Sequence, residues 1–125
     1  MAVTVSTVST PLGTKLVLDT ATDTNSNAAE DNVVAGATNV YYVEIDNKNN
    51  SAATYVKLSN STDATPNSTT PDHVFYAPGG VKVSYVIETG IVFSAGLSFW
   101  GTSTAGSATT QTDPSESVTT KILCG

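Results

Sequence analysis

His73 and Cys124 are the side chains of this sequence best suited to catalysis, and each is the only residue of its type. A catalytic triad needs a base that a third group orients, and Asp72 is the residue beside the histidine. Successive residues of a strand point to opposite faces, so Asp72 would not orient His73. Nothing near Cys124 would lower the pKa of its thiol. We therefore expect no catalytic residue: His73 is interpreted as a strand-edge residue with a structural hydrogen bond, and Cys124 as a frayed thiol without an intrachain disulfide.

The segment that begins at Asp23 copies the first half of a calcium-binding loop, with Asp23, Asn25 and Asn27 in the order D-x-N-x-N. Such a loop needs a glycine at its sixth position and a bidentate glutamate at its twelfth. This chain has Ala28 and Val34 there. Half of a ligand set does not hold the ion, so we predict no metal site and no cofactor.

Four aromatic side chains are candidates for recognition rather than reaction: Tyr42, Tyr55, Tyr76 and Trp100. Exposed rings of this kind stack on sugars, and the same rings also pack in a core or a protein interface. Both interpretations stay open, and packing is the one that we favour. We therefore count these four residues as candidate partner-binding residues.

Composition limits the partners that suit the chain. Its 125 residues have 11 acidic and 5 basic side chains, which gives a net charge of −6. Because nucleic acids and anionic membranes repel an acidic protein, we expect neither as a partner. The N-terminus has no basic segment followed by an apolar run, and no stretch is long enough to cross a bilayer. We expect a soluble protein without a secretory signal.

The elements that position these side chains are predicted to be strands. Only 13% of the residues are charged, and Thr, Ser and Asn supply the remaining polarity, which suits exposed faces of strands better than exposed helices. Residues 40–46 and 54–59 alternate apolar and polar side chains around an Asn-rich turn, which predicts a hairpin. Short strands at regular spacing predict an all-β fold, a two-sheet β-sandwich or jelly roll of about eight antiparallel strands in a single domain of residues 1–125. The other expected strands are 15–18, 33–34, 73–77, 81–88, 91–93, 97–100 and 118–123.

The N-terminal third is less regular. Residues 1–13 are expected to form an extended N-terminal arm or an edge strand, because residues 2–10 are rich in β-branched side chains and end at Pro11. Val3, Val5 and Val8 are its candidate partner-binding residues. Residues 19–32 carry four acidic groups and almost no apolar side chain, so we expect an exposed acidic loop.

Three stretches of the chain resemble the small structural proteins of tailed bacteriophage virions, particularly those of cyanophages. They read YVEIDNKNNSAATYVKL at 42–58, FYAPGGV at 75–81 and ETGIVFSAGLSFWGT at 88–102. The resemblance covers about half of the chain and leaves out the first 38 residues. It implies a jelly-roll or sandwich domain of the decoration or cement type, which binds the outside of the assembled head and stabilises the junctions between capsomers.

The resemblance also implies the protein's surroundings. The partner would be the major capsid protein, the chain would form a homo-oligomer, either a trimer or a dimer, and its place would be the capsid exterior of the virion after synthesis in the host cytoplasm. Such a protein is not an enzyme. Two alternatives stay open: a tail or fibre domain that recognises a host surface glycan, and a tail or connector subunit.

Overall fold

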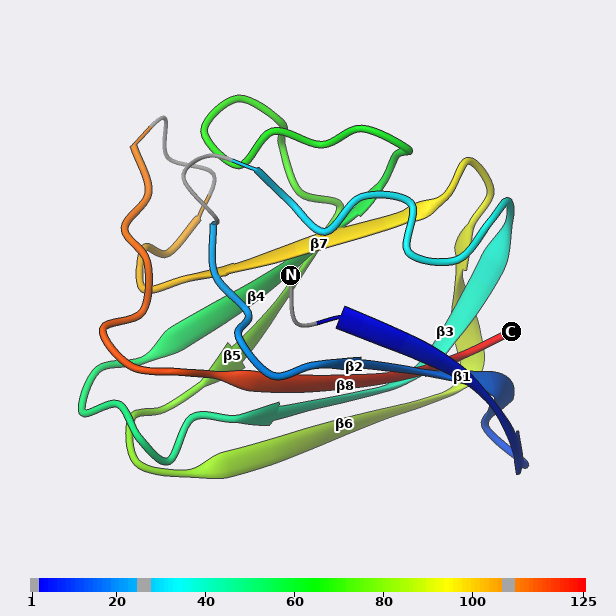
Figure 1. Cartoon of the computed structure of the whole chain (residues 1–125), viewed down its shortest axis with the longest axis horizontal. Helices are drawn as coiled ribbons and strands as arrows, with labels where there is room; N and C mark the ends of the chain where they lie inside the picture. Colours follow the sequence, from blue (N-terminus) through cyan, green and yellow to red (C-terminus); the bar gives the residue numbers. More distant parts are fainter. Residues whose placement is uncertain (1–2, 25–27, 107–109) are drawn as a thin grey trace.

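Two antiparallel sheets pack face to face in the computed structural model, which describes residues 3–24, 28–106 and 110–125 (Figure 1). Within these residues the chain forms eight strands and no helix, as the sequence predicted. The five-stranded sheet has the order β1 (Val3–Thr10), β2 (Gly13–Asp19), β8 (Thr119–Cys124), β3 (Thr38–Asp46) and β6 (Lys82–Phe93). The three-stranded sheet has the order β5 (His73–Ala77), β4 (Thr54–Asn60) and β7 (Leu97–Thr102).

The chain crosses repeatedly from one sheet to the other. It passes from β3 to β4, from β5 to β6, from β6 to β7 and from β7 to β8 by changing sheets each time. The sheet order β2-β8-β3-β6 therefore faces the order β7-β4-β5 in a two-sheet β-sandwich. The β1–β2 hairpin extends the larger sheet by one strand.

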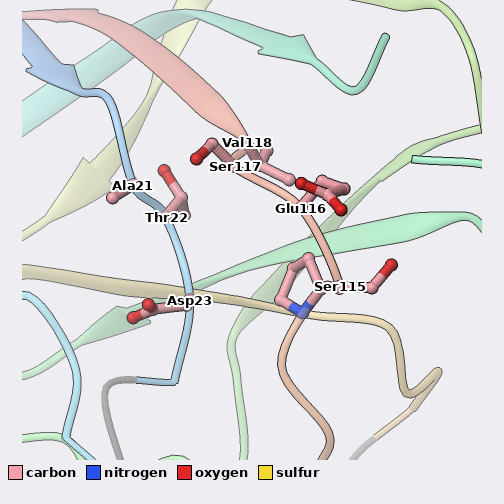
Figure 2. Close-up of a pocket in the computed structure, with 8 residues that line it drawn as sticks. Ala21, Thr22, Asp23, Ser115, Glu116, Ser117 and Val118 are labelled. Carbon is pink, nitrogen blue, oxygen red and sulfur yellow. The ribbon is translucent and has the colours of Figure 1, made fainter. Parts of the chain in front are cut away.

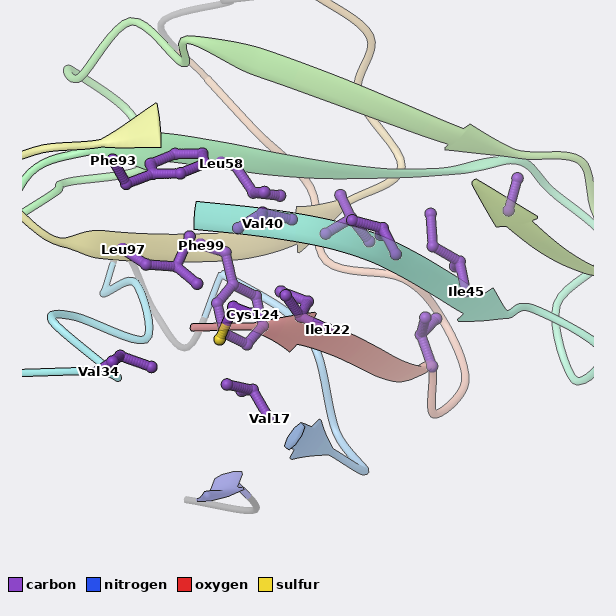
Figure 3. Close-up of a cluster of buried hydrophobic side chains, with 14 residues drawn as sticks. Val17, Val34, Val40, Ile45, Leu58, Phe93, Leu97, Phe99, Ile122 and Cys124 are labelled. Atoms are coloured by element: carbon purple, nitrogen blue, oxygen red, sulfur yellow. The ribbon is translucent and has the colours of Figure 1, made fainter. Parts of the chain in front are cut away.

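The core lies between the two sheets and follows the two-residue period of the strands. Val43 and Ile45 of β3 are fully buried, as are Val56 and Leu58 of β4. Tyr42, Glu44 and Asp46, which alternate with the two core residues of β3, are half-buried on the other face. Phe99 of β7 fills the centre of the layer, where it lies over the strand that carries Ile122 (Figure 3). The remaining buried members of this cluster are Val17, Val34, Val40, Ala77, Phe93, Leu97, Val118, Ile122 and Cys124.

The expected hairpin between residues 40–46 and 54–59 is wrong. β3 pairs with β6 and β8, whereas β4 pairs with β5 and β7, so the two strands lie in different sheets. Asn47 sits fully buried at the crossing, and its Nδ2 donates to the carbonyl oxygens of Ala52, Ala77 and Pro78. The Asn-rich turn therefore forms a corner between sheets, because its side chains bond to distant backbone instead of closing a tight turn.

The expectation of an exposed loop at residues 19–32 is also wrong for much of the segment. Asp19, Thr22, Thr24, Ala29 and Glu30 are buried, while Asn25 and Asn27 lie outside the described residues. The segment runs along the free edge of β7, where its backbone pairs with that strand. The backbone hydrogen bonds run from Glu30 N to Phe99 O at 2.8 Å, from Phe99 N to Glu30 O at 3.0 Å and from Gly101 N to Asp23 O at 3.1 Å, and just beyond the segment Val33 N donates to Leu97 O at 2.9 Å.

A glycine in β7 makes this covering possible. A Cβ atom at Gly101 would lie 2.8 Å from Cγ2 and 3.0 Å from the backbone oxygen of Thr22, closer than such atoms approach. The acidic residues of the segment predicted exposure to solvent, but a local pattern contains no information about its backbone partner β7, which lies 64 to 78 residues away in sequence.

Candidate interaction surfaces

The N-terminal segment is an edge strand rather than a detached arm. β1 pairs with β2 along one side and has no strand on its other side, since it is the first strand of the five-stranded sheet. Val5 is 44% exposed, whereas Val8 is half-buried and Val3 packs against the core. Ala2 lies outside the described residues. The sequence of β1, VTVSTVST, contains no charged residue and no proline.

These features make β1 an unguarded sheet edge. Natural proteins usually protect an edge strand with lysine, proline, a strong bulge or a covering loop, because its free N–H and C=O groups can pair with another chain. In β1 the register shift lies only at its end, between Thr7 and Thr10. A strand of another protein can therefore add along Val3–Thr7, with backbone hydrogen bonds as the main attraction.

A second surface lies on the opposite side of the sandwich, where β5 and β6 end their sheets. We call it the β5/β6 edge. The described residues expose six large apolar side chains, and only Val5 lies away from this edge. Val74 and Tyr76 point outward from the smaller sheet and Val86 points outward from the larger one, so the two edge strands expose apolar side chains on both sides of the sandwich. The five residues of the β5/β6 edge are Val74, Tyr76, Val81, Val86 and Val92.

Aromatic contacts hold β5 against β6 across the two sheets. The rings of Phe75 and Tyr85 meet edge to face with centroids 5.2 Å apart. The hydroxyl of Tyr85 also donates to the backbone oxygen of Tyr76. These contacts hold the two edge strands, β5 and β6, in a fixed position relative to each other.

The candidate tyrosines lie in three different settings. Tyr76 is 45% exposed on the outer face of the smaller sheet, and Tyr55 lies opposite it on β4 with ring centroids 5.4 Å apart. Tyr42 is half-buried on the outer face of the larger sheet, and its hydroxyl donates to Oε1 of Glu44 at 2.9 Å. Burial, and then that bond, raise the pKa of Tyr42. Only Tyr55 and Tyr76 therefore form a joint aromatic surface.

Trp100 cannot be a partner-binding residue in this structure, because it is fully buried. It lies on the outer face of the smaller sheet, beneath the loops that carry Ala29 and Ala64, with which it forms a second small core. Its Nε1 donates to Oε1 of Gln111 at 3.2 Å. The favoured interpretation of packing therefore holds for Trp100, but the sequence could not show that loops from elsewhere in the chain cover this side chain.

Lys57 is the unexpected member of this second core. It stands opposite Trp100 in the β4–β7 register and is fully buried, where alternation predicted an exposed lysine. Its ammonium donates to the carbonyl oxygen of Gly106 and to Oε1 of Gln111, the latter at 3.0 Å. Burial lowers the pKa of Lys57. No sequence signal distinguishes this lysine from a solvated one.

The candidate catalytic residues have structural surroundings. The ring of His73 packs edge to face on Phe93 with centroids 5.8 Å apart, while Asp72 accepts a hydrogen bond from the backbone N–H of Asn60 at 2.7 Å. Cys124 is fully buried within β8, so the expectation of a frayed thiol is wrong. Burial raises the pKa of the Cys124 thiol, which disfavours the reactive thiolate.

One depression of about 240 Å³ opens between residues 21–23 and 114–118 (Figure 2). Ser115, Ser117 and Glu116 line one wall, and Thr22 and Asp23 line the other. Hydroxyl and carboxylate groups predominate, and no histidine, cysteine or lysine is among the lining residues.

Two carboxylates in the segment of residues 19–32, those of Asp19 and Glu30, are buried. Oδ2 of Asp19 and Oε2 of Glu30 have no hydrogen-bond partner among the described residues. Burial raises the pKa of both groups, and the charge of Asp19 raises that of Glu30 further. Across the part of the chain that the structure describes, no three His, Cys, Asp or Glu side chains gather as metal ligands. The pair is thus a source of electrostatic strain.

No protein-family model, curated protein or solved structure matches the chain. Among residues 3–24, 28–106 and 110–125, no helix has the length and hydropathy needed to cross a membrane. The arguments about function therefore come from the surfaces of this structure and from the sequence resemblance.

Proposed function

We propose that this protein is a non-enzymatic decoration, or cement, protein that binds the outside of an assembled phage head and stabilises the junctions between capsomers. The observation that carries the proposal is β1, an uncharged edge strand whose outer side is open to pairing. The sequence resemblance to small virion proteins supports the same role. The net charge of −6 would keep such a protein soluble before it finds the head.

The physical mechanism is linkage. A protein that binds the closed shell, and not the open or dissociated one, shifts the equilibrium toward the closed shell by mass action. Strand addition by β1 to the major capsid protein would supply backbone hydrogen bonds, and Val5 would lose its 44% exposure in the contact. A rigid sandwich suits this task because ordering the partner surface then costs little conformational entropy.

Occupancy on purified heads tests the proposal. Heads that lack the chain are mixed with recombinant protein, and bound copies are counted by quantitative mass spectrometry. Wild-type protein should occupy the heads in hundreds of copies, and Val5→Asp should reduce occupancy, because a buried carboxylate at the contact costs binding energy. Ala52→Asp is the control, since Ala52 is exposed in the connection between β3 and β4, outside both β1 and the β5/β6 edge. Absence of binding by wild-type protein, or equal loss in both variants, would overturn the proposal.

A second candidate, a tail or fibre domain that binds a host glycan, is favoured by one observation. Tyr55 and Tyr76 form a tilted pair of rings on an outer sheet face, and such rings can stack on sugars. This candidate predicts a copy number of a few dozen per virion at most. It also predicts binding to host polysaccharide that Tyr76→Ala abolishes, whereas a decoration protein needs neither result.

A further inference from the structure

We propose that two copies of this chain pair through β6, antiparallel across a two-fold axis at Tyr85, so that their larger sheets become one continuous sheet. The inference rests on the proposed structural role and names the surface of self-association. It starts from the β5/β6 edge, which carries most of the exposed apolar side chains of the described residues. Strand β6 is the last strand of its sheet, and no other strand of the described residues lies on its outer side. Its pairing with β3 is regular over Lys82–Val86 and the register shifts between Val86 and Ile91, so the proposed contact centres on the regular stretch.

The exposure pattern of β6 limits the registers that a partner strand can adopt. Lys82, Ser84, Val86 and Glu88 are exposed, and the residues between them are half-buried. Directly opposite residues of an antiparallel pair point to the same face. The outward set of one copy must therefore stand opposite the outward set of the other, which excludes every register that is shifted by one residue.

Charge selects one register from those that remain. With Tyr85 opposite its own copy, Lys82 stands opposite Glu88 of the second copy, and the two-fold axis repeats this pair. A register centred on Lys82 would place Lys82 opposite its own copy, and a register centred on Glu88 would do the same for Glu88, so two like charges would face each other. Centres at Ser84 or Val86 place each of these charges opposite an uncharged residue. The Tyr85-centred register alone pairs opposite charges twice, which makes the edge self-complementary in charge.

The two charged residues are available for this contact. Both are exposed, and the ion pair in the described part of the chain is a different one, between Lys121 and Glu44 at 3.7 Å. The same register places Val86, which is 59% exposed, opposite Ser84 of the second copy. Pairing would thus cover exposed apolar surface while the charges define the register.

Charge reversal tests the pairing on the purified full-length chain without heads. Dimer affinity is measured by analytical ultracentrifugation for Lys82→Glu, for Glu88→Lys and for the double reversal. Each single variant should bind its copy about tenfold more weakly, because two symmetry-related pairs become repulsive, and the double reversal should restore wild-type affinity. Lys15→Glu is the control, since Lys15 lies on β2, which β8 and β3 separate from β6.

Cross-linking tests the register itself. In the proposed dimer, positions 84 and 86 of opposite copies face each other at a separation that suits a disulfide. Ser84→Cys/Val86→Cys should therefore form a covalent dimer on oxidation, and Lys82→Cys/Val86→Cys should not. The buried Cys124 does not compete for this reaction.

Any one of three results would overturn the pairing. The wild-type chain stays monomeric, the double reversal binds as weakly as the single variants, or only Lys82→Cys/Val86→Cys forms a cross-link. Because these experiments contain no heads, their failure would leave the head-occupancy result unchanged.

Discussion

Asn47→Ala is the substitution that tests the architecture most directly. The buried Asn47 amide donates to Ala52 O at 3.0 Å, Ala77 O at 3.3 Å and Pro78 O at 3.1 Å. Its Oδ1 accepts from Nδ2 of Asn50 at 2.9 Å and from Oγ1 of Thr54 at 2.8 Å. One side chain therefore ties the β3–β4 corner to the connection between β5 and β6.

The expected loss follows from these contacts. Each hydrogen bond contributes about 1 kcal/mol net, and five of them set a ceiling of roughly 5 kcal/mol for the change in the free energy of unfolding. Water can reach part of the corner after truncation, because Ala52 is exposed and Pro78 is half-buried. We therefore expect Asn47→Ala to lower the free energy of unfolding by about 3 kcal/mol. Asn47→Asp should cost at least as much, because a carboxylate would then face three carbonyl oxygens.

Urea denaturation followed by tryptophan fluorescence measures this change, since Trp100 is buried in the folded state. With a slope of about 1–3 kcal/mol/M, the transition midpoint should fall by roughly 1–3 M. Asn49→Ala is the control, because Asn49 is exposed in the same turn and should change the midpoint little. A loss below about 1 kcal/mol for Asn47→Ala, or equal losses for both variants, would refute the assignment of Asn47 as the tie between the sheets.

Three further predictions concern buried polar groups. Lys57→Met should raise the free energy of unfolding at neutral pH by about 1 kcal/mol, because burial lowers the pKa of that lysine and the charged form is costly; a loss of stability in urea would contradict this. Glu30→Gln should stabilise the protein at neutral pH, and the gain should shrink as the pH falls through the raised folded pKa of Glu30 toward its ordinary value of 4.5. The folded state binds more protons than the unfolded state in that window, so wild-type stability rises there as pH falls, and a pH-independent difference between the two proteins would count against it. The Cys124 thiol should react with a thiol reagent only as fast as the protein unfolds, because it is buried with a raised pKa; rapid labelling of the native protein would disprove its burial.

Local alternation in the sequence determined the strands and the fold class. The segments that contain Val43, Val56 and Val83 repeat apolar residues with period two, and each became a strand with one face toward the core. The threonine-rich composition argued against exposed helices. Like alternation, this argument depends only on each residue and its nearest neighbours.

Tertiary structure alone decided which strands pair and which faces are covered. β3 and β4 are neighbours in sequence, yet they lie in different sheets because the Asn47 amide bonds to carbonyl groups up to 31 residues away. Trp100 and Lys57 carry the alternation of an exposed face, and the loops that bury them come from distant parts of the chain. Strand pairing and loop covering are contacts between residues far apart in sequence. Periodicity records the direction of a side chain, and it contains no information about what lies opposite.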